Sequence, residues 1–185
     1  YDAEFDALRK SGGWTQCLIS IGIIASENGV VRDSFYSLIQ PKNFRRLTRV
    51  VKEMTHLNDE DILLAPSFAY IMAQAEVFFL RYMDDTSALY CFGPDDKRTI
   101  AGHAQYENVL YPTIFDQSVD LQKSVSRKIT WQDRMVSPAL SLDDLKCVYG
   151  IAGEVEHNAR NDALDLMRIH EASRYGTPIK QKVKE

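Results

Sequence analysis

The stretch WTQCLISIGIIASENGVVRDSFYSLI, residues 14–39, decides the fold of this chain. Its first half, residues 14–25, is apolar and rich in β-branched residues, and its second half, residues 30–39, largely alternates between apolar and polar side chains. Asn28 and Gly29 lie between the two halves, and Asn-Gly is the strongest short sequence signal for a hairpin turn. The sequence therefore predicts two antiparallel strands joined by a tight turn.

Shorter strands and helices alternate after this hairpin. A helix whose apolar residues are spaced by three and four is expected to begin after Ser67. The other expected elements are strands at residues 88–92 and 118–121 and helices at residues 95–106, 141–150 and 158–174. This order of elements predicts an α/β or α+β domain with a mixed sheet.

Length and composition narrow the class of protein. A chain of 185 residues with 45% apolar residues is expected to form one domain with a sizeable core. No apolar run is long enough to cross a membrane, and the sequence does not open like a secretory signal. The widely separated Cys17, Cys91 and Cys147 predict reduced thiols in a cytoplasmic protein. The formal net charge of −4 at first disfavours a polyanionic partner.

Three acidic residues are candidates for chemistry, although each has an ordinary alternative. Asp2 and Glu4 would point to the same face of a strand, where two like charges repel unless a cation lies between them. They could equally lie on a solvated strand edge. Asp96 and its neighbour Asp95 follow a short strand and open a helix, where the helix dipole alone favours acids. The edge of a sheet where strands end is also where functional sites gather.

The segment EHNARNDA, residues 156–163, is the most informative. His157 and Asp162 are five residues apart, so on a regular helix they would lie about 140° apart. They converge only if His157 lies just outside the helix and Asn158 is near the N-cap.

Small residues surround the acid of this segment. Ala159 and Ala163 share the helix face of Asp162 and would let the helix press close to a strand. A carboxylate on an otherwise apolar face is costly unless it is paired or metal-bound. Asp165, in contrast, is expected on the solvated outer face.

In order and spacing these segments resemble the DEDDh exonucleases, the DnaQ-like 3′–5′ exonucleases of the ribonuclease H-like superfamily. Residues 2–5 (DAEF) resemble the first motif, D-x-E at the end of the first strand, and residues 157–163 carry the third, H-x-A-x-x-D-A. Residues 92–96 (FGPDD) resemble the W-G-x-x-D motif of exoribonucleases of the histone-mRNA and sporulation-inhibitor type, with Phe92 in place of Trp. Residues 55–57 (THL) are similar to the family's T-G-I segment, with His in place of Gly.

The resemblance implies a fold and a domain organisation. The fold would be α/β, a ribonuclease H-like mixed five-stranded β-sheet flanked by α-helices. Residues 1–176 would form a single exonuclease domain whose first strand is truncated at the start, and residues 177–185 would form a basic C-terminal tail.

The resemblance also implies a mechanism. Asp2, Glu4, Asp96 and Asp162 would hold two divalent cations, Mg²⁺ or Mn²⁺, which suit oxygen ligands. His157 would act as the general base, a role that requires the neutral imidazole and predicts activity that rises with pH.

The expected partner is single-stranded nucleic acid, or a short oligonucleotide, with a free 3′-OH. By resemblance, Phe5, His56 and Leu57 would contact its terminal nucleotides. Basic residues in segments 42–52 and 123–134 could track phosphates or could simply be solvated. No membrane partner is expected, and the oligomeric state stays open.

Several functions stay open. The leading one is 3′–5′ exonuclease activity with a slight preference for RNA. Proofreading or repair of DNA, and a catalytically idle domain that binds nucleic acid or protein, are alternatives. A His/Asp non-haem iron site is remote because no H-x-D pair is present.

Overall fold

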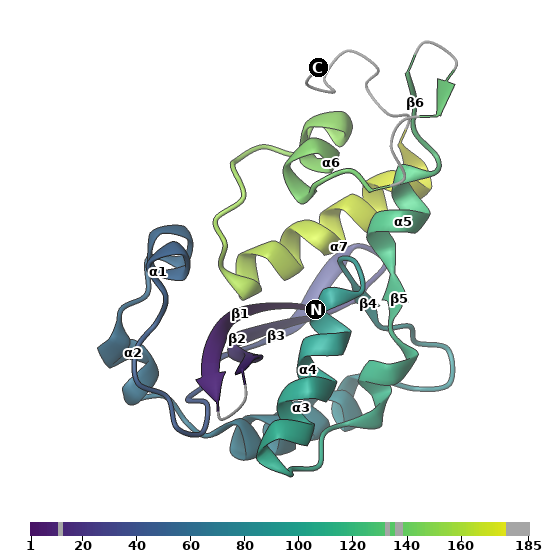
Figure 1. Ribbon diagram of the computed structural model, residues 1–185. Coiled ribbons are helices and arrows are strands. Elements are labelled where there is room, and N and C mark those ends of the chain that lie inside the picture. The colour runs from purple at the N-terminus through teal and green to yellow at the C-terminus, as the bar shows by residue number, and fades with distance from the viewer. Residues whose placement is uncertain (11–12, 132–133, 136–138, 177–185) are drawn as a thin grey trace.

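The computed structural model describes residues 1–10, 13–131, 134–135 and 139–176 (Figure 1). The predicted basic tail, residues 177–185, lies outside them. Three long strands form an antiparallel sheet in the order β1-β2-β3, and their bounds are β1 Asp2–Lys10, β2 Gly13–Glu27 and β3 Val30–Leu38. Asn28 (φ 51°) and Gly29 (φ 76°) both adopt the left-handed conformation that a two-residue hairpin turn requires. The predicted hairpin is confirmed.

Two further strands form a second, parallel sheet next to the start of β1. The two-residue strands β4 (Tyr90–Cys91) and β5 (Val119–Asp120) pair in parallel. The amino group of Tyr1 donates a hydrogen bond to the carbonyl oxygen of Tyr90 over 2.7 Å, so the start of β1 lies against β4. Five strands of mixed direction are therefore present, as expected, but in two sheets joined at this point. The short hairpin of β6 (Thr130–Trp131) and β7 (Arg134–Met135) was not predicted.

Seven helices and one 3₁₀ turn are found among the described residues. Their bounds are α1 Arg49–Thr55, α2 Asp59–Leu63, α3 Phe68–Tyr82, the 3₁₀ turn Thr113–Gln117, α4 Asp95–Glu107, α5 Leu121–Ser126, α6 Leu142–Tyr149 and α7 Ala159–Tyr175. Ser67 and Ser141 cap α3 and α6, and Gly150 ends α6 in the left-handed conformation, as predicted. Among the described helices, none combines the length and apolar character needed to span a bilayer.

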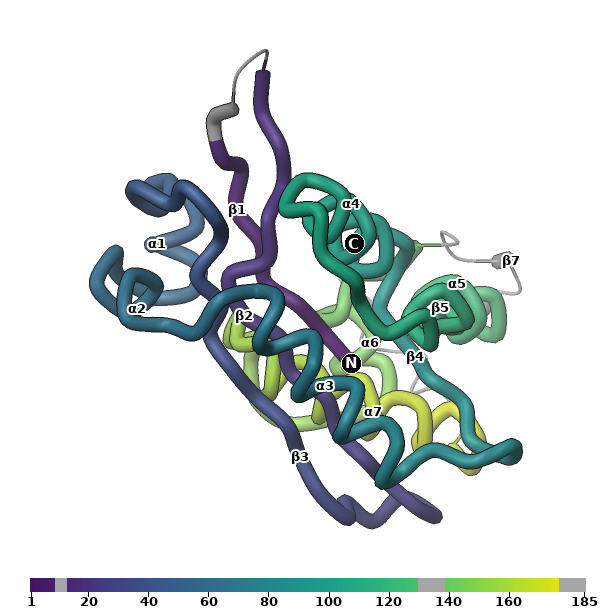
Figure 2. The backbone as a smooth tube through the Cα atoms, turned by 90° about the horizontal axis from the view of Figure 1, so that it is seen from below, coloured from purple at the N-terminus to yellow at the C-terminus, as the bar shows by residue number. Residues whose placement is uncertain are grey.

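The long strand β2 forms the centre of the core. Its residues 17–23 are all buried, because helices cover both faces of the sheet. A strand in this situation is expected to be continuously apolar. Helix α3 lies on one face and α7 on the other (Figure 2).

A glycine of β2 allows α7 to approach the sheet. Gly22 pairs with Asp2 of β1. A Cβ atom at Gly22 would lie 2.2 Å from the carbonyl oxygen of Ala159, the first residue of α7. Because Gly22 has no side chain and Ala159 has only a methyl group, the start of α7 can lie directly against β1 and β2. Asp162 is thereby brought close to these strands.

A buried ion pair fixes the other side of α7. Asp165 is only 5% exposed, so the expectation that it lies on a solvated face is wrong. Its carboxylate contacts the ammonium group of Lys146 from α6 and, at 2.9 Å, the guanidinium group of Arg168. Lys146 Nζ also donates to the carbonyl oxygen of Glu154 over 3.0 Å. The pair thereby ties α6 and α7 to the loop that leads to His157.

Substitution of Gly22 tests the close approach of α7. Gly22→Ala should lower the free energy of unfolding by about 1–3 kcal/mol, because the helix must retreat from the new methyl group. Urea denaturation measures the change. Gly102→Ala is the matched control, because a Cβ there meets nothing within 4 Å. Since alanine favours a helix, this control should be neutral or stabilising by up to about 1 kcal/mol. Equal stabilities of the two variants would contradict the proposed packing.

Substitution of Lys146 tests the buried pair. Lys146→Met should destabilise the chain by about 3 kcal/mol, because it leaves the buried Asp165 carboxylate with only a half-exposed arginine. The double variant Lys146→Met/Asp165→Leu should recover most of this loss. Guanidinium denaturation of both, with Lys123→Met as an exposed control, measures the effect. A double variant no more stable than the single one would show that the pair is not the cause.

Candidate active site

Strand β1 places two carboxylates near two others. Burial raises the pKa of Asp2 well above its ordinary value, and the negative charges of Asp96, Glu4 and Asp162 raise it further. Burial and the charge of Asp162 raise the pKa of Glu4 to about 7. The four acids therefore lie close enough to repel one another, although they come from β1, α4 and α7.

Glu4, His157 and Asp162 form the tightest group. One ligand atom from each of these side chains lies within 4.8 Å of the other two. His157 has a φ of 49° and precedes the helix, while the side chain of Asn158 caps α7 by accepting from the amides of Arg160 and Asn161. The histidine thus lies just outside the helix, the geometry that its spacing from Asp162 requires.

Asp96 is the acid that enters the site from α4. It is 5% exposed, whereas Asp95 is exposed and lies 3.6 Å from Arg98. Burial raises the pKa of Asp96 to about 7, and the Tyr1 ammonium group and a hydrogen bond from the Phe92 backbone oppose the rise. The structure thereby separates the two adjacent aspartates into one buried and one solvated group.

Two carboxylate oxygens of this cluster have no hydrogen-bond partner. They are Asp96 Oδ2 and Asp162 Oδ1, and within the described part of the chain they are the only buried side-chain oxygen or nitrogen atoms without one. A buried polar atom left unpaired costs about 1–3 kcal/mol, so such atoms usually indicate a missing partner. Carboxylate oxygens grouped in this way fit hard divalent cations such as Mg²⁺ and Mn²⁺.

The residue after Glu4 lies at an irregularity of the sheet. Glu4 pairs with Ser20 but Phe5 pairs with Leu18, so one residue of β2 is left over. The backbone N–H of Leu18 donates instead to Nδ1 of the fully buried His103 over 3.0 Å. This β-bulge lies in β2, opposite the step from Glu4 to the half-buried Phe5, immediately beside the carboxylates.

The other two predicted substrate contacts lie between α1 and α2. His56 is exposed and has a φ of 58°, since it ends α1 in the left-handed conformation. The left-handed backbone conformation explains why the family has a glycine at this position. In this chain a histidine adopts the same conformation. Leu57 is half-buried and packs against Ile19, Leu47 and Ile62. Among the described contacts, none joins His56 or Leu57 directly to the four carboxylates.

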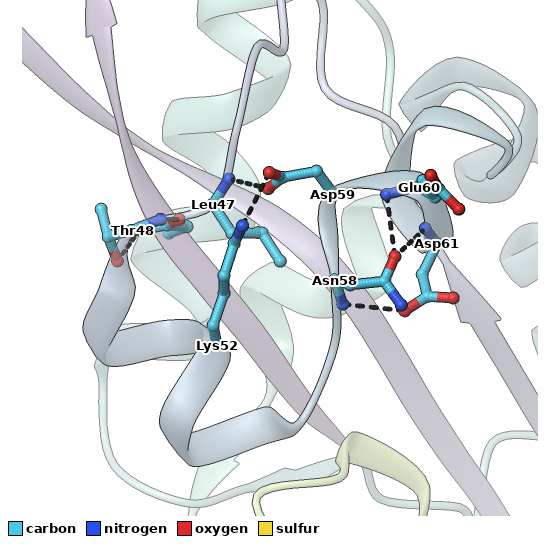
Figure 3. Close-up of polar contacts among 8 residues, drawn as sticks. Leu47, Thr48, Lys52, Asn58, Asp59, Glu60 and Asp61 are labelled. Carbon is cyan, nitrogen blue, oxygen red and sulfur yellow. Dashed lines mark hydrogen bonds and ion pairs between the residues drawn. The ribbon is translucent and has the colours of Figure 1, made fainter.

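Polar contacts hold this α1–α2 segment together (Figure 3). Lys52 Nζ lies 2.6 Å from Asp59 Oδ2, and Asp59 Oδ1 accepts from the Leu47 amide over 2.8 Å. Asn58 and Asp61 form a capping box at the start of α2. The segment is thus braced on both sides of Leu57.

Sequence reasoning missed the residue that attaches this segment to β1. Asp6 is 3% exposed, and its carboxylate accepts from the amide of Thr48 at 2.6 Å and from its hydroxyl at 2.8 Å. Thr48 caps α1. The alternation Asp2, Glu4, Asp6 along one strand is the signal that could have identified it.

Three solved structures resemble the whole arrangement. The nuclease domain of 3′hExo, a DEDDh family member bound to rAMP, matches with a TM-score of 0.77 and 15% identity, covering 99% of this chain and 94% of that one. A 3′-exonuclease that recognises the histone mRNA stem-loop matches with a TM-score of 0.75 and 14% identity, covering 94% and 63%. Cell-death related nuclease 4 matches with a TM-score of 0.71 and 21% identity, covering 91% and 61%. These likenesses confirm the expected ribonuclease H-like fold.

The match to these chains is partial in length. This chain covers only 63% and 58% of two of the 3′-exonuclease structures. No curated protein matches the sequence.

The family model RNase_T, described as exonuclease, matches residues 1–170. Because that match covers nearly the whole sequence, the chain belongs to the RNase_T exonuclease family, as its motifs predict.

Proposed function

We propose that the chain is a metal-dependent 3′–5′ exonuclease that removes nucleoside 5′-monophosphates from the 3′ end of single-stranded nucleic acid or short oligonucleotides. The observation that carries this proposal is the cluster of four mutually repelling carboxylates, in which Asp96 Oδ2 and Asp162 Oδ1 lack partners. A structural role would leave these oxygens paired, whereas a role in binding cations requires them to be available.

Each residue of the cluster has a proposed role. Asp2, Glu4, Asp96 and Asp162 would hold two divalent cations. Such ions, when bound, supply an activated water and neutralise charge on the leaving 3′ oxygen. The half-buried His157 is positioned beside Glu4 and Asp162, and as the neutral imidazole it would take the proton of the attacking water.

The substrate is held at its end. Phe5, at the bulge beside Glu4, and Leu57, braced between α1 and α2, would contact the last nucleotides, with His56 beside them. Lys42, Arg45 and Arg46 are exposed just before α1, and the Asp6–Thr48 contact ties this region to β1. They are suited to contact phosphates of the incoming strand.

RNA is the preferred substrate in this proposal. Two of the similar solved structures are described with a histone mRNA stem-loop and with rAMP, and the FGPDD segment resembles the exoribonuclease form of the motif. Trimming of DNA is the second candidate, because nothing at the carboxylate cluster itself distinguishes the two sugars. An idle binding domain is disfavoured, since all four acids and His157 are retained.

Digestion of end-labelled strands tests the activity. With 5′-labelled single-stranded RNA and DNA, Mg²⁺ or Mn²⁺ should give a ladder that shortens from the 3′ end, and EDTA should stop it. Asp162→Asn should reduce the rate by at least about a hundredfold, because it removes a ligand charge from the cluster. Asp95→Asn, one residue from Asp96 but solvated, should keep nearly full activity. The absence of shortening with either polymer and either metal would leave only the idle domain.

Thermal denaturation tests the cation site without any substrate. Because Glu4 and Asp96 have raised pKa values of about 7, the folded chain holds protons that the unfolded chain releases. Their effect in the metal-free chain is therefore to lower stability as pH rises from about 4 to about 7. At pH 7.5, Mn²⁺ should raise Tm by several degrees.

Asp96→Asn is the informative variant in this experiment. In EDTA at pH 7.5 it should be at least as stable as the unmodified chain, because it relieves repulsion, but it should gain much less from Mn²⁺. Asp95→Asn should behave like the unmodified chain in both respects. An equal shift of Tm by Mn²⁺ in all three chains would place the cation elsewhere.

A further inference from the structure

A buried histidine of α4 contacts the bulge beside the carboxylates. Helix α4 runs next to the β1–β2 hairpin (Figure 2), and His103 is 0% exposed, with its ring against that of Phe68. Nδ1 accepts the backbone N–H of Leu18, so the proton of the neutral ring is assigned to Nε2. Nε2 then donates to Oε1 of Glu107 over 2.8 Å. Both ring nitrogens therefore make directed hydrogen bonds.

Glu107 extends this network to the start of the basic segment. The same oxygen, Oε1, accepts from the backbone N–H of Lys42 over 2.6 Å, and the glutamate side chain is only 8% exposed. Burial opposes its ionisation, but the hydrogen bonds from His103 and Lys42 outweigh this effect and lower the pKa of Glu107. One buried network thus joins the bulge opposite Phe5 to the first basic residue before α1.

Two pairing registers meet at the bulge. The first residues of β1 pair in one register, with Asp2 opposite Gly22, and the rest of the strand pairs in another. If the second register continued to the start of β1, Asp2 would lie opposite Ile21, which is fully buried in the apolar core. A slip of one residue exchanges the two faces of a sheet. The bulge therefore keeps Asp2 and Glu4 on the face of Gly22, where α7 lies.

The polar character of His103 serves the bulge and not the packing of α4. An apolar side chain could fill the space against Phe68, but it would leave the buried N–H of Leu18 without its acceptor. Such an unpaired group costs about 1–3 kcal/mol. The histidine thus stabilises the local backbone arrangement in which the register changes.

We propose that His103 is a positioning residue that fixes this bulge and thereby holds Glu4 and Phe5 in place at the carboxylate cluster. Glu107 orients the imidazole ring and extends the same constraint to Lys42. The inference rests on the proposed function, in which Glu4 binds a cation and Phe5 contacts the terminal nucleotide. Because His103 is fully buried, it acts through the strands and touches neither the cations nor the substrate.

Two substitutions of His103 separate its two hydrogen bonds. In His103→Asn the amide oxygen takes the place of Nδ1 and still accepts from Leu18, whereas in His103→Gln the amide nitrogen takes the place of Nε2 and only the bond to Glu107 is kept. Amide hydrogen exchange at Leu18 should be roughly tenfold faster in the Gln variant and at most about twofold faster in the Asn variant. Circular dichroism checks that both chains fold.

The cation site and the kinetic constants distinguish positioning from packing. His103→Gln should lose at least about half of the rise in Tm that Mn²⁺ gives the unmodified chain at pH 7.5, because Glu4 is displaced. It should lower kcat about tenfold and raise KM for a short oligonucleotide severalfold, since small displacements at a reacting centre are costly. His103→Asn should restore most of each loss. Glu107→Ala, at the end of α4, is a second variant and should show the same changes at smaller size.

Each outcome decides the proposal. Unchanged exchange at Leu18 in both His103→Gln and Glu107→Ala would overturn it. Faster exchange with an unchanged Mn²⁺ response and unchanged kinetic constants would leave His103 a packing role alone. A weakened Mn²⁺ response in His103→Gln, in a chain whose unmodified form binds Mn²⁺ but degrades neither RNA nor DNA, would support the positioning of Glu4 and contradict the exonuclease. An unmodified chain that neither responds to Mn²⁺ nor degrades nucleic acid would overturn both proposals.

Discussion

Repulsion among Asp2, Glu4, Asp96 and Asp162 is the constraint on which the rest of this structure depends. Burial raises the pKa values of all four, and the negative charges of neighbouring acids of the cluster raise those of Asp2, Glu4 and Asp96 further. The close approach of Ala159 to Gly22, and not an attraction among the four carboxylates, brings α7 to this point. The packing of the sheet and its helices must therefore supply the free energy that keeps these acids close.

The acids of this chain fall into two environments. Asp6 and Asp165 are as buried as Asp96 and Asp162, but their oxygens bind Thr48 in one case and Lys146 and Arg168 in the other. Asp162 and Asp165 lie one turn apart on the same helix, yet only the latter has cationic partners among the described residues. The paired acids stabilise the scaffold, and the unpaired ones are available to a ligand. The difference between partnered and unpartnered oxygens is thus a better guide to function here than burial.

Local signals account for what could be predicted from the sequence. The Asn28-Gly29 turn, the Ser67 and Ser141 caps and the placement of His157 before α7 each depend on a few neighbouring residues. The four acids of the candidate site were selected because a motif fixes their order along the chain.

Features that depend on distant contacts were missed or wrong. The buried state of Asp165 is set by Lys146 on another helix, although a lysine four residues after Leu142 on the apolar face of α6 was a visible sign. The strand β4 is shorter than predicted because its length depends on pairing with β5 and with Tyr1, and both contacts are remote in sequence. The bulge opposite Phe5 depends on a histidine that is 85 positions away from Leu18.

The four acids of the cluster account for the whole formal net charge of −4. Four of the 26 acidic residues lie in the cluster, and the remaining 22 equal the 22 basic residues. Outside the cluster the chain is therefore neutral, and its overall field neither attracts nor repels a polyanion strongly. In the proposed function, binding would then depend on short-range contacts: cations at the carboxylates and exposed bases such as Arg45 and Arg46 near α1. For the proposed exonuclease, such contacts favour the end of a nucleic-acid strand over its interior, because an end brings few phosphates and one free hydroxyl to the four carboxylates.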